Sequence, residues 1–154
     1  MVSLQKETLR IPLVSELMIP SEKVAHVQIS NPLEHALLVL VKSGYSAVPV
    51  LDPSYTFQGV ISKTRILEET IGIEEFEMNR LSEIMVKEVM DDQVPCLTKE
   101  QTMIDALHKL IDHPFVCVTD DKGEFDGIVT RRTILKQFSK HYHETLKYTM
   151  LETT

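Results

Sequence analysis

Glycine is scarce in this chain, at only five of 154 residues. A loop that cradles phosphates needs several closely spaced glycines, so the sequence offers no such cradle. It also lacks the G-x-S-x-G, H-E-x-x-H and G-x-x-x-x-G-K patterns of acyl transfer, zinc-dependent hydrolysis and nucleotide hydrolysis. These absences argue against an enzyme of any of those classes.

Cysteines and long apolar stretches are also sparse. The two cysteines, Cys96 and Cys117, form no C-x-x-C pair, and we expect both to be buried thiols in a reducing compartment. No apolar run approaches the roughly 18 residues of a membrane-spanning helix, and the first residues lack the apolar stretch of a secretory signal. We therefore expect a cytoplasmic protein.

Positive charge is in deficit, with 16 Lys and Arg against 23 Asp and Glu. This balance disfavours nucleic acids as partners, because proteins that bind them neutralise phosphates with basic surfaces. It still allows a small phosphate-bearing ligand held by a few local cations.

His141 and His143 lie two positions apart, where helical side chains diverge, so we expect no metal site there.

What the sequence does contain is an internal repeat. Residues 24–67 and 94–135 share one order: an extended stretch, an amphipathic helix, two short strands and a second helix. The copies close on Gly59-Val60-Ile61-Ser62 and Gly127-Ile128-Val129-Thr130. The period is too long for a solenoid of small repeats. We predict an α/β (α+β) fold in which two tandem βαββα units pack pseudo-symmetrically.

The first long helix is the best signalled element. Asn31 can cap it, Pro32 suits its first position, and Gly44 can end it. The pattern also predicts short helices at 14–18, 81–85 and 86–90, strands at 24–29, 47–51 and 115–118, helices over 103–111 and 68–79, and a long helix from 132 to about 148.

The doubled Gly-apolar-apolar-Ser/Thr pattern resembles a pair of cystathionine-β-synthase (CBS) domains, a Bateman module, over about residues 14–138. Residues 23–27, 31–40 and 115–118 resemble more narrowly the stand-alone CBS proteins of Gram-positive bacteria that bind cyclic di-AMP. The resemblance implies a lead-in at 1–13, a first CBS unit at 14–70, a linker at 71–80, a second CBS unit at 81–138, and a C-terminal helix and tail at 139–154.

Thr130-Arg131-Arg132-Thr133 is the strongest candidate site, because a strand is predicted to end and a helix to begin there. Free N–H groups and the helix dipole favour an anion at such a corner, and guanidinium groups are bidentate phosphate donors. The alternative is that Thr130 only caps the helix and that the two arginines are solvated.

The resemblance implies that three segments line one ligand cleft. Backbone groups of Ala25 and Ala47 would read an adenine edge, Tyr45 would offer a ring face, and the arginines would hold phosphate. The implied ligand-binding residues are Lys23, Val24, Ala25, Tyr45, Ser46, Ala47, Thr130, Arg131, Arg132 and Thr133. No catalytic residue, metal or cofactor is implied.

The sequence departs from many nucleotide-binding CBS copies at one informative position. Those copies end on Ser/Thr-x-x-Asp, whose carboxylate binds the ribose diol, whereas this chain has Arg65 and Thr133 there. A cyclic dinucleotide has no free 2′,3′-diol, so the substitution favours cyclic di-AMP over AMP or ATP. The pseudo-symmetric second cleft would involve Val94, Pro95, Cys96, Phe115 and the turn at 62–65, and we expect Phe115 to fill it because its counterpart is Ala47.

These features predict a non-catalytic nucleotide sensor that binds cyclic di-AMP and controls a target protein. The resemblance implies targets such as the (p)ppGpp synthetase/hydrolase of the stringent response, or a metabolic enzyme. We also predict a homodimer formed through the apolar segments 14–18, 86–90 and 134–138. The alternatives are an energy sensor for AMP, ADP or ATP, a small enzyme, and an interaction module with an empty cleft.

Overall fold

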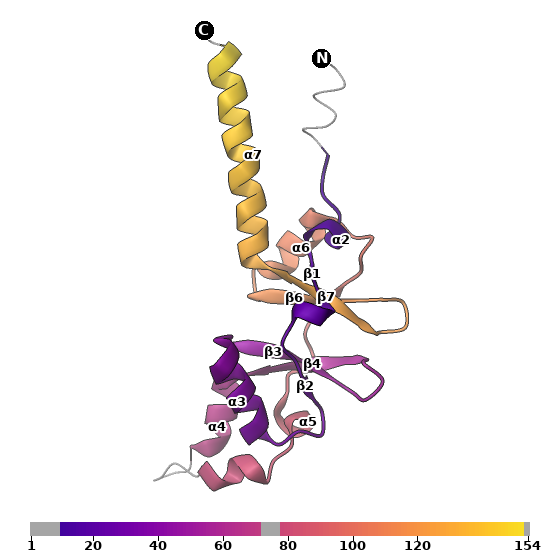
Figure 1. Ribbon diagram of the computed structural model, residues 1–154, viewed down its shortest axis with the longest axis vertical. Helices are drawn as coiled ribbons and strands as arrows, with labels where there is room; N and C mark the ends of the chain where they lie inside the picture. Colours follow the sequence, from indigo (N-terminus) through magenta and orange to yellow (C-terminus); the bar gives the residue numbers. More distant parts are fainter. Residues whose placement is uncertain (1–9, 72–77, 153–154) are drawn as a thin grey trace.

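The structure is a computed structural model that describes residues 10–71 and 78–152, with side chains as far as residue 147. Most of the predicted lead-in, residues 72–77 of the predicted linker and helix, and the last two residues therefore lie outside the described residues. Figure 1 shows two units stacked along the long axis, with one long helix projecting from the upper unit.

Both units have the predicted order of strands and helices. The first contains β2 (Val27–Gln28), α3 (Leu33–Ser43), β3 (Ala47–Leu51), β4 (Phe57–Ser62) and α4 (Lys63–Thr70). The second contains β5 (Cys96–Leu97), α6 (Met103–Leu110), β6 (Phe115–Thr119), β7 (Phe125–Thr130) and α7 (Arg131–Glu152). In each, a short strand runs parallel to a central strand that pairs antiparallel with the next. The predicted α/β fold of two pseudo-symmetric units is confirmed.

The start of α3 differs in detail from the prediction. Pro32 is the N-cap and the helix begins at Leu33, one residue later than expected. The Asn31 side chain instead accepts a hydrogen bond from the N–H of Gln28, at 2.7 Å. An Asn oxygen that accepts from a nearby N–H in the preceding turn cannot also cap the helix with the same geometry. The predicted stop is confirmed, since Gly44 adopts a left-handed conformation with φ of 77°.

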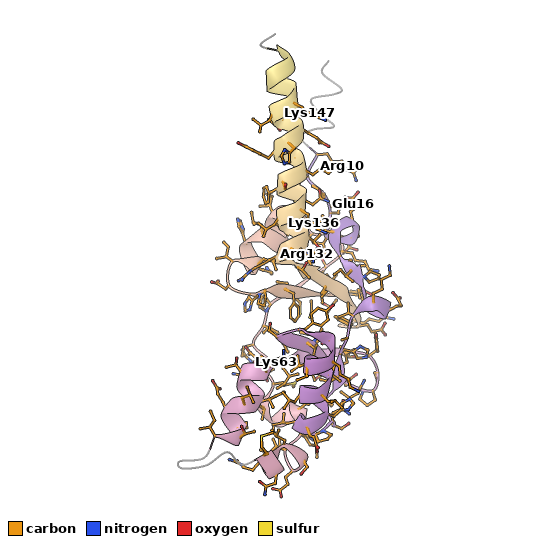
Figure 2. The ribbon with its side chains drawn as sticks, turned by 60° about the vertical axis from the view of Figure 1, so that its left-hand side comes forward. Arg10, Glu16, Lys63, Arg132, Lys136 and Lys147 are labelled. Carbon is orange, nitrogen blue, oxygen red and sulfur yellow. The ribbon has the colours of Figure 1, made fainter. Side chains whose placement is uncertain are left out.

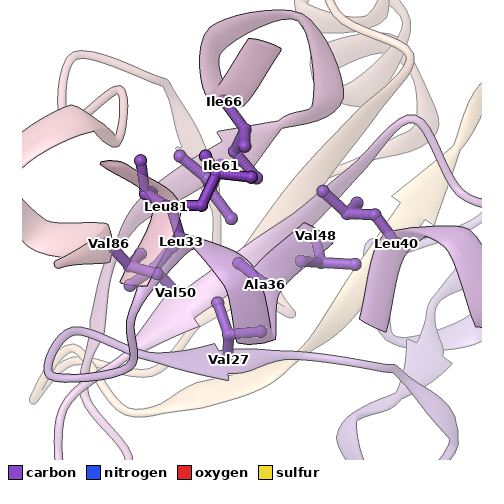
Figure 3. Packing of buried hydrophobic residues seen from close by; sticks show 10 residues of the cluster. All are labelled: Val27, Leu33, Ala36, Leu40, Val48, Val50, Ile61, Ile66, Leu81 and Val86. Atoms are coloured by element: carbon purple, nitrogen blue, oxygen red, sulfur yellow. The ribbon is translucent and has the colours of Figure 1, made fainter. Parts of the chain in front are cut away.

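The segments that lead into each unit are exchanged between the units. Helix α2 (Val14–Leu17) precedes the first unit but packs with Leu97 and Val129 in the core of the second. Conversely, η2 (Met78–Ser82) and α5 (Val86–Val89) precede the second unit, yet Leu81 and Val86 lie in the core of the first (Figure 3). Burying a Val or Leu side chain contributes about 1.5 to 3 kcal/mol, so each unit depends on the exchange for several kcal/mol.

Strand pairing follows the same exchange. Strand β1 (Ile19–Pro20) joins the sheet of the second unit, antiparallel to β7, with Pro20 opposite Gly127. In the first unit, Val60 of β4 exchanges two backbone hydrogen bonds with Asp91, of 2.9 and 2.8 Å. Both contacts bring a backbone against a glycine. A Cβ atom on Gly127 would lie 2.1 Å from the carbonyl oxygen of Ile19, and one on Gly59 would lie 2.6 Å from that of Asp91.

A smaller cluster joins the two units. Val24, Leu51, Cys117, Phe125 and Ile128 are buried together between the sheets. Of the two predicted buried thiols, Cys117 is buried and Cys96 is half-buried. Burial raises the pKa of the Cys117 thiol well above its ordinary value and also raises the pKa of Cys96. Both thiols are therefore protonated and unreactive at neutral pH.

The tips of the two long hairpins also meet. The N–H of Phe57 donates to the Gly123 carbonyl and the N–H of Phe125 to the Tyr55 carbonyl, both at 3.0 Å. Tyr55 is left-handed with φ of 67°, a conformation that costs a residue with a side chain about 1 to 2 kcal/mol.

Among the described residues, no helix is long and apolar enough to cross a bilayer.

Alanine at the two close-approach glycines tests the interlocked strands. We expect Gly127→Ala to lower the free energy of unfolding by about 3 kcal/mol, because β1 must move to admit a methyl group. Gly59→Ala should have a smaller effect in the same direction, since the space there is less tight. Urea denaturation measures both.

The matched control for this series is Gly44→Ala. No atom lies within 4 Å of a Cβ atom at Gly44, so only the left-handed backbone opposes the substitution there. We expect a loss of about 1 kcal/mol. Equal losses at all three positions would contradict the close approach of β1 to β7.

Candidate functional site

A cleft of about 160 Å³ lies at the junction of the two units. Six of the ten predicted ligand-binding residues line it: Val24, Ala25, Tyr45, Ser46, Ala47 and Thr130. They come from the segment between β1 and β2, from the turn before β3 and its first residue, and from the last residue of β7. The structure thus brings together around one cleft three segments that are far apart in the sequence.

Local structure explains how these residues reach the cleft. Gly44 turns the chain at the end of α3, so that Tyr45 and Ser46 lead directly into β3. The N–H of Lys63 donates to the Ser46 carbonyl at 3.0 Å, which holds this turn against the start of α4. Ala47 follows as the first residue of β3, and its methyl group leaves room beside the backbone. Small side chains at Ala25 and Ala47 let a flat ring approach the main chain.

The corner at Thr130 has the predicted strand-to-helix form. Its hydroxyl accepts a hydrogen bond from the N–H of Thr133 at 3.2 Å and lies 3.1 Å from the Thr133 hydroxyl. Thr130 therefore caps α7 and lines the cleft at once. In the first unit, the Ser62 hydroxyl caps α4 by accepting a hydrogen bond from the N–H of Arg65.

Arg131 takes a position that the sequence did not predict. Its guanidinium donates to the carbonyls of Leu110 and Ile111, at 2.7 and 3.1 Å. The backbone N–H of Arg131 donates to the Pro114 carbonyl at 3.1 Å. Helix α6 lacks a C-terminal glycine, and its last carbonyls need other donors. The predicted phosphate role of Arg131 must therefore compete with a structural one.

Of the three predicted cations, Arg132 and Lys23 have side chains that stay available. Both are exposed and lie outside the lining of the cleft, Arg132 at the base of α7 and Lys23 at the end of η1 (Ser21–Lys23) (Figure 2). Within the part of the chain that the structure describes, the Arg132 guanidinium makes no hydrogen bond or ion pair with another side chain. Arg132 follows the corner of Thr130 by two residues, and Lys23 directly precedes the lining residue Val24.

Sequence reasoning missed five residues that also line the cleft: Val48, Pro49, Pro114, Phe115 and Ile128. Ile128 carried a usable signal, because side chains two apart on a strand share a face, and Ile128 lies two residues before Thr130. Pro114 and Phe115 are the repeat counterparts of Ser46 and Ala47, so pseudo-symmetry could have placed them nearby.

The pseudo-symmetric second cleft is much smaller, at about 50 Å³. Val94, Pro95 and Phe115 line it as predicted, whereas Cys96 and the turn at 62–65 do not. Phe115 lies on the walls of both clefts. Pro95 has no N–H where its counterpart Ala25 has one. Among the described residues, no group of His, Cys, Asp and Glu side chains could hold a metal ion.

Comparisons of this chain with protein families and with known proteins agree on one family. The CBS domain family matches residues 14–72 and 86–140. Cyclic di-AMP receptor B of Bacillus subtilis is 45% identical over 141 residues, which are 92% of this chain and 96% of that protein.

Solved structures agree with this match. A CBS domain-containing protein of unknown function from Bacillus anthracis is 54% identical, with a TM-score of 0.81 over 88% of this chain and 98% of that one. The CbpB protein of Listeria monocytogenes, solved in complex with cyclic di-AMP, is 45% identical, with a TM-score of 0.79 over 84% of this chain and 97% of that one.

Replacing each of the two adjacent arginines with alanine should change the free energy of unfolding by different amounts. Arg131→Ala removes the donors to the end of α6, so we expect the free energy of unfolding to fall by about 1.5 kcal/mol. Arg132→Ala removes no hydrogen bond or ion pair among the described residues and should change the free energy of unfolding by less than about 0.5 kcal/mol. Thermal and urea denaturation of the ligand-free proteins measure the difference, and equal stabilities would contradict the capping role of Arg131.

Proposed function

The chain belongs to the CBS domain family, and from that premise we propose that it is a non-catalytic receptor that binds cyclic di-AMP between its two CBS units. The observation that carries the proposal is the cleft, in which six predicted residues from three distant segments meet. The identity to a cyclic di-AMP receptor over nearly the whole of both chains supports it. The two cysteines are unpaired, in keeping with the reducing cytoplasm that we propose as the compartment.

The cleft divides into parts that suit the parts of this ligand. Backbone groups of Ala25 and Ala47 would bind an adenine edge, and the exposed ring of Tyr45 would cover a base. The N-terminus of α7 presents a partial positive charge beside Thr130, where a phosphate would be stabilised. Arg132 and Lys23 would supply the charge-assisted hydrogen bonds. Cyclic di-AMP carries two phosphates, and Arg132 and Lys23 would each bind one.

The rival ligands AMP, ADP and ATP have a free ribose diol. The corner offers no carboxylate to bind it, because Thr133 replaces the aspartate and its hydroxyl lies beside that of Thr130. A mononucleotide would therefore leave its diol poorly matched, and an unmatched buried polar group costs about 1 to 3 kcal/mol. This favours the cyclic dinucleotide over the energy-sensor alternative.

Arg132→Ala should weaken cyclic di-AMP binding by about 1.5 to 3 kcal/mol, because a charge-assisted phosphate contact is lost. Isothermal titration calorimetry measures the change. Lys147→Ala, on the same helix but far from the cleft, is the control and should bind as the parent does. AMP and ATP should compete weakly. If Arg132→Ala and Lys23→Ala both bind like the parent, the site is misplaced.

We further propose that the ligand controls a target protein, such as a (p)ppGpp synthetase/hydrolase or a metabolic enzyme. The described residues form two CBS units and their helices, and their surface is where we expect a target protein to bind. The rim of the cleft changes most on binding, because the nucleotide would add negative charge and cover Arg132. A ligand shifts a partner equilibrium only through different affinities for the two states.

We expect cyclic di-AMP to release the target from the nucleotide-free protein. Linkage makes the effect reciprocal, so the target should weaken nucleotide binding by the same factor. Surface plasmon resonance with a purified (p)ppGpp synthetase/hydrolase, with and without nucleotide, measures the direction. Binding that needs the nucleotide would reverse the proposed sign, and binding that ignores it would leave no sensor mechanism of this kind.

The proposed homodimer can use only one of the three predicted segments, 134–138, where Leu135 and Phe138 are exposed. Val14, Leu17, Val86 and Ile134 are buried within the chain, so the segments 14–18 and 86–90 do not present the expected apolar face. Exposed apolar residues lie instead at equivalent places on the helices of both units. Val41 and Ile111 are 62% and 68% exposed, and Leu67 and Leu135 are 39% and 66% exposed. Association through these helices would cover them.

Light scattering at tens of micromolar should therefore report a dimer. Ile111→Glu combined with Leu135→Glu should shift it to a monomer, because two charges would be desolvated in the interface. Lys122→Glu, at the tip of a hairpin, is the control and should stay dimeric. A monomeric parent protein would refute the proposal.

A further inference from the structure

The hairpin between β3 and β4 holds a tyrosine in an unfavourable backbone conformation. Tyr55 has φ of 67° and is the only residue other than glycine with a positive φ in the described part of the chain. Its counterpart in the second repeat is Gly123, which has φ of 83°. Glycine adopts this conformation without a steric penalty, whereas a tyrosine does not. A strained residue that persists where glycine would fit suggests that its side chain has a role.

The ring of Tyr55 touches two segments outside its own hairpin. It meets the ring of His26 edge-on, with centroids 5.4 Å apart and planes at 84°. It also meets the ring of Phe125 at 6.2 Å. Its carbonyl accepts the N–H of Phe125 at 3.0 Å, and His26 Nδ1 lies 3.2 Å from the Val24 carbonyl. Tyr55 thus ties the β3–β4 hairpin both to the 24–26 segment and to β7.

Each of these segments continues into a wall of the cleft. The residues before His26 are Val24 and Ala25, which line the cleft directly. Strand β7 begins at Phe125 and reaches the cleft at Ile128 and Thr130. Strand β3, which precedes the Tyr55 turn, starts at the cleft with Ala47. The lining segments therefore converge on the Tyr55 ring at the end away from the corner of Thr130.

We propose that Tyr55 is a positioning residue for the nucleotide: its ring fixes the separation of the Val24–Ala25 wall from the β7 wall without touching the ligand. The choice of ligand rests on the proposed function, but the fixing of the walls does not. A tyrosine that only covered Phe125 would affect stability and leave affinity and wall mobility unchanged.

The test compares Tyr55→Gly with Tyr55→Phe. The phenylalanine keeps the ring and the strain and should bind cyclic di-AMP like the parent. The glycine loses the ring and should bind about tenfold more weakly, mainly through faster dissociation, because the walls are no longer held apart correctly. Its melting temperature should stay close to that of the parent, because relief of the strained backbone offsets the lost ring contacts.

A double-mutant cycle identifies the route of the effect. His26→Ala should weaken binding, and the double variant should lose little more than Tyr55→Gly alone, because Tyr55→Gly already breaks the contact between His26 and Tyr55. Additive losses would overturn the proposal, and so would a Tyr55→Phe protein that binds as weakly as Tyr55→Gly.

Amide hydrogen exchange provides a readout that needs no ligand. In the nucleotide-free proteins, the amide of Val24, which donates to the Ser21 carbonyl at 3.1 Å, should exchange faster in Tyr55→Gly than in Tyr55→Phe. Equal exchange in the two proteins would overturn the proposal. If the parent fails to bind cyclic di-AMP, the proposed function falls, while the exchange rates still decide whether Tyr55 holds the wall.

Discussion

The exchange of leading segments between the two units is the constraint on which the rest of the structure depends. Val14 and Leu17 complete the core of the second unit, and Leu81 and Val86 complete that of the first. Each unit therefore owes part of its buried apolar surface to residues that precede the other copy. Because this burial is worth several kcal/mol in a fold whose net stability is of order 10 kcal/mol, neither repeat is complete alone.

The same exchange creates the cleft. The chain leaves the sheet of the second unit at β1 and enters that of the first at β2, so residues 21–26 must cross the junction. Val24 and Ala25 lie on this crossing and form one wall. The second crossing, after Asp91, brings Val94 and Pro95 to the smaller cleft in the same way. Two clefts are thus a consequence of the topology, before any side chain has a binding role.

Side chains then make the two clefts different. Ala47 and its counterpart Phe115 both line both clefts, but the methyl group of Ala47 takes up much less space than the ring of Phe115. Ala25 keeps an N–H that its counterpart Pro95 lacks. Two cations follow Thr130, whereas Lys63 and Thr64 follow the equivalent Ser62. Space, donors and charge all favour the cleft at Thr130, which is the physical basis for placing the ligand there.

Local chemistry in the sequence was enough to determine the repeat, most helices and strands, and the corner at Thr130. Gly44 ends α3 as expected because few residues other than glycine adopt the left-handed conformation easily. The contacts at residues 130–133 were predicted from local chemistry, and the other six came from the family resemblance; the role of all ten as ligand-binding residues stays a prediction. Only the tertiary structure decided which unit each leading helix completes, since Val14 and Val86 are apolar and suit either core. It also decided that the Arg131 guanidinium donates to the carbonyls at the end of α6 while that of Arg132 makes no such bond. The two side chains are chemically identical, so only the groups that the fold places next to each of them can give them different partners.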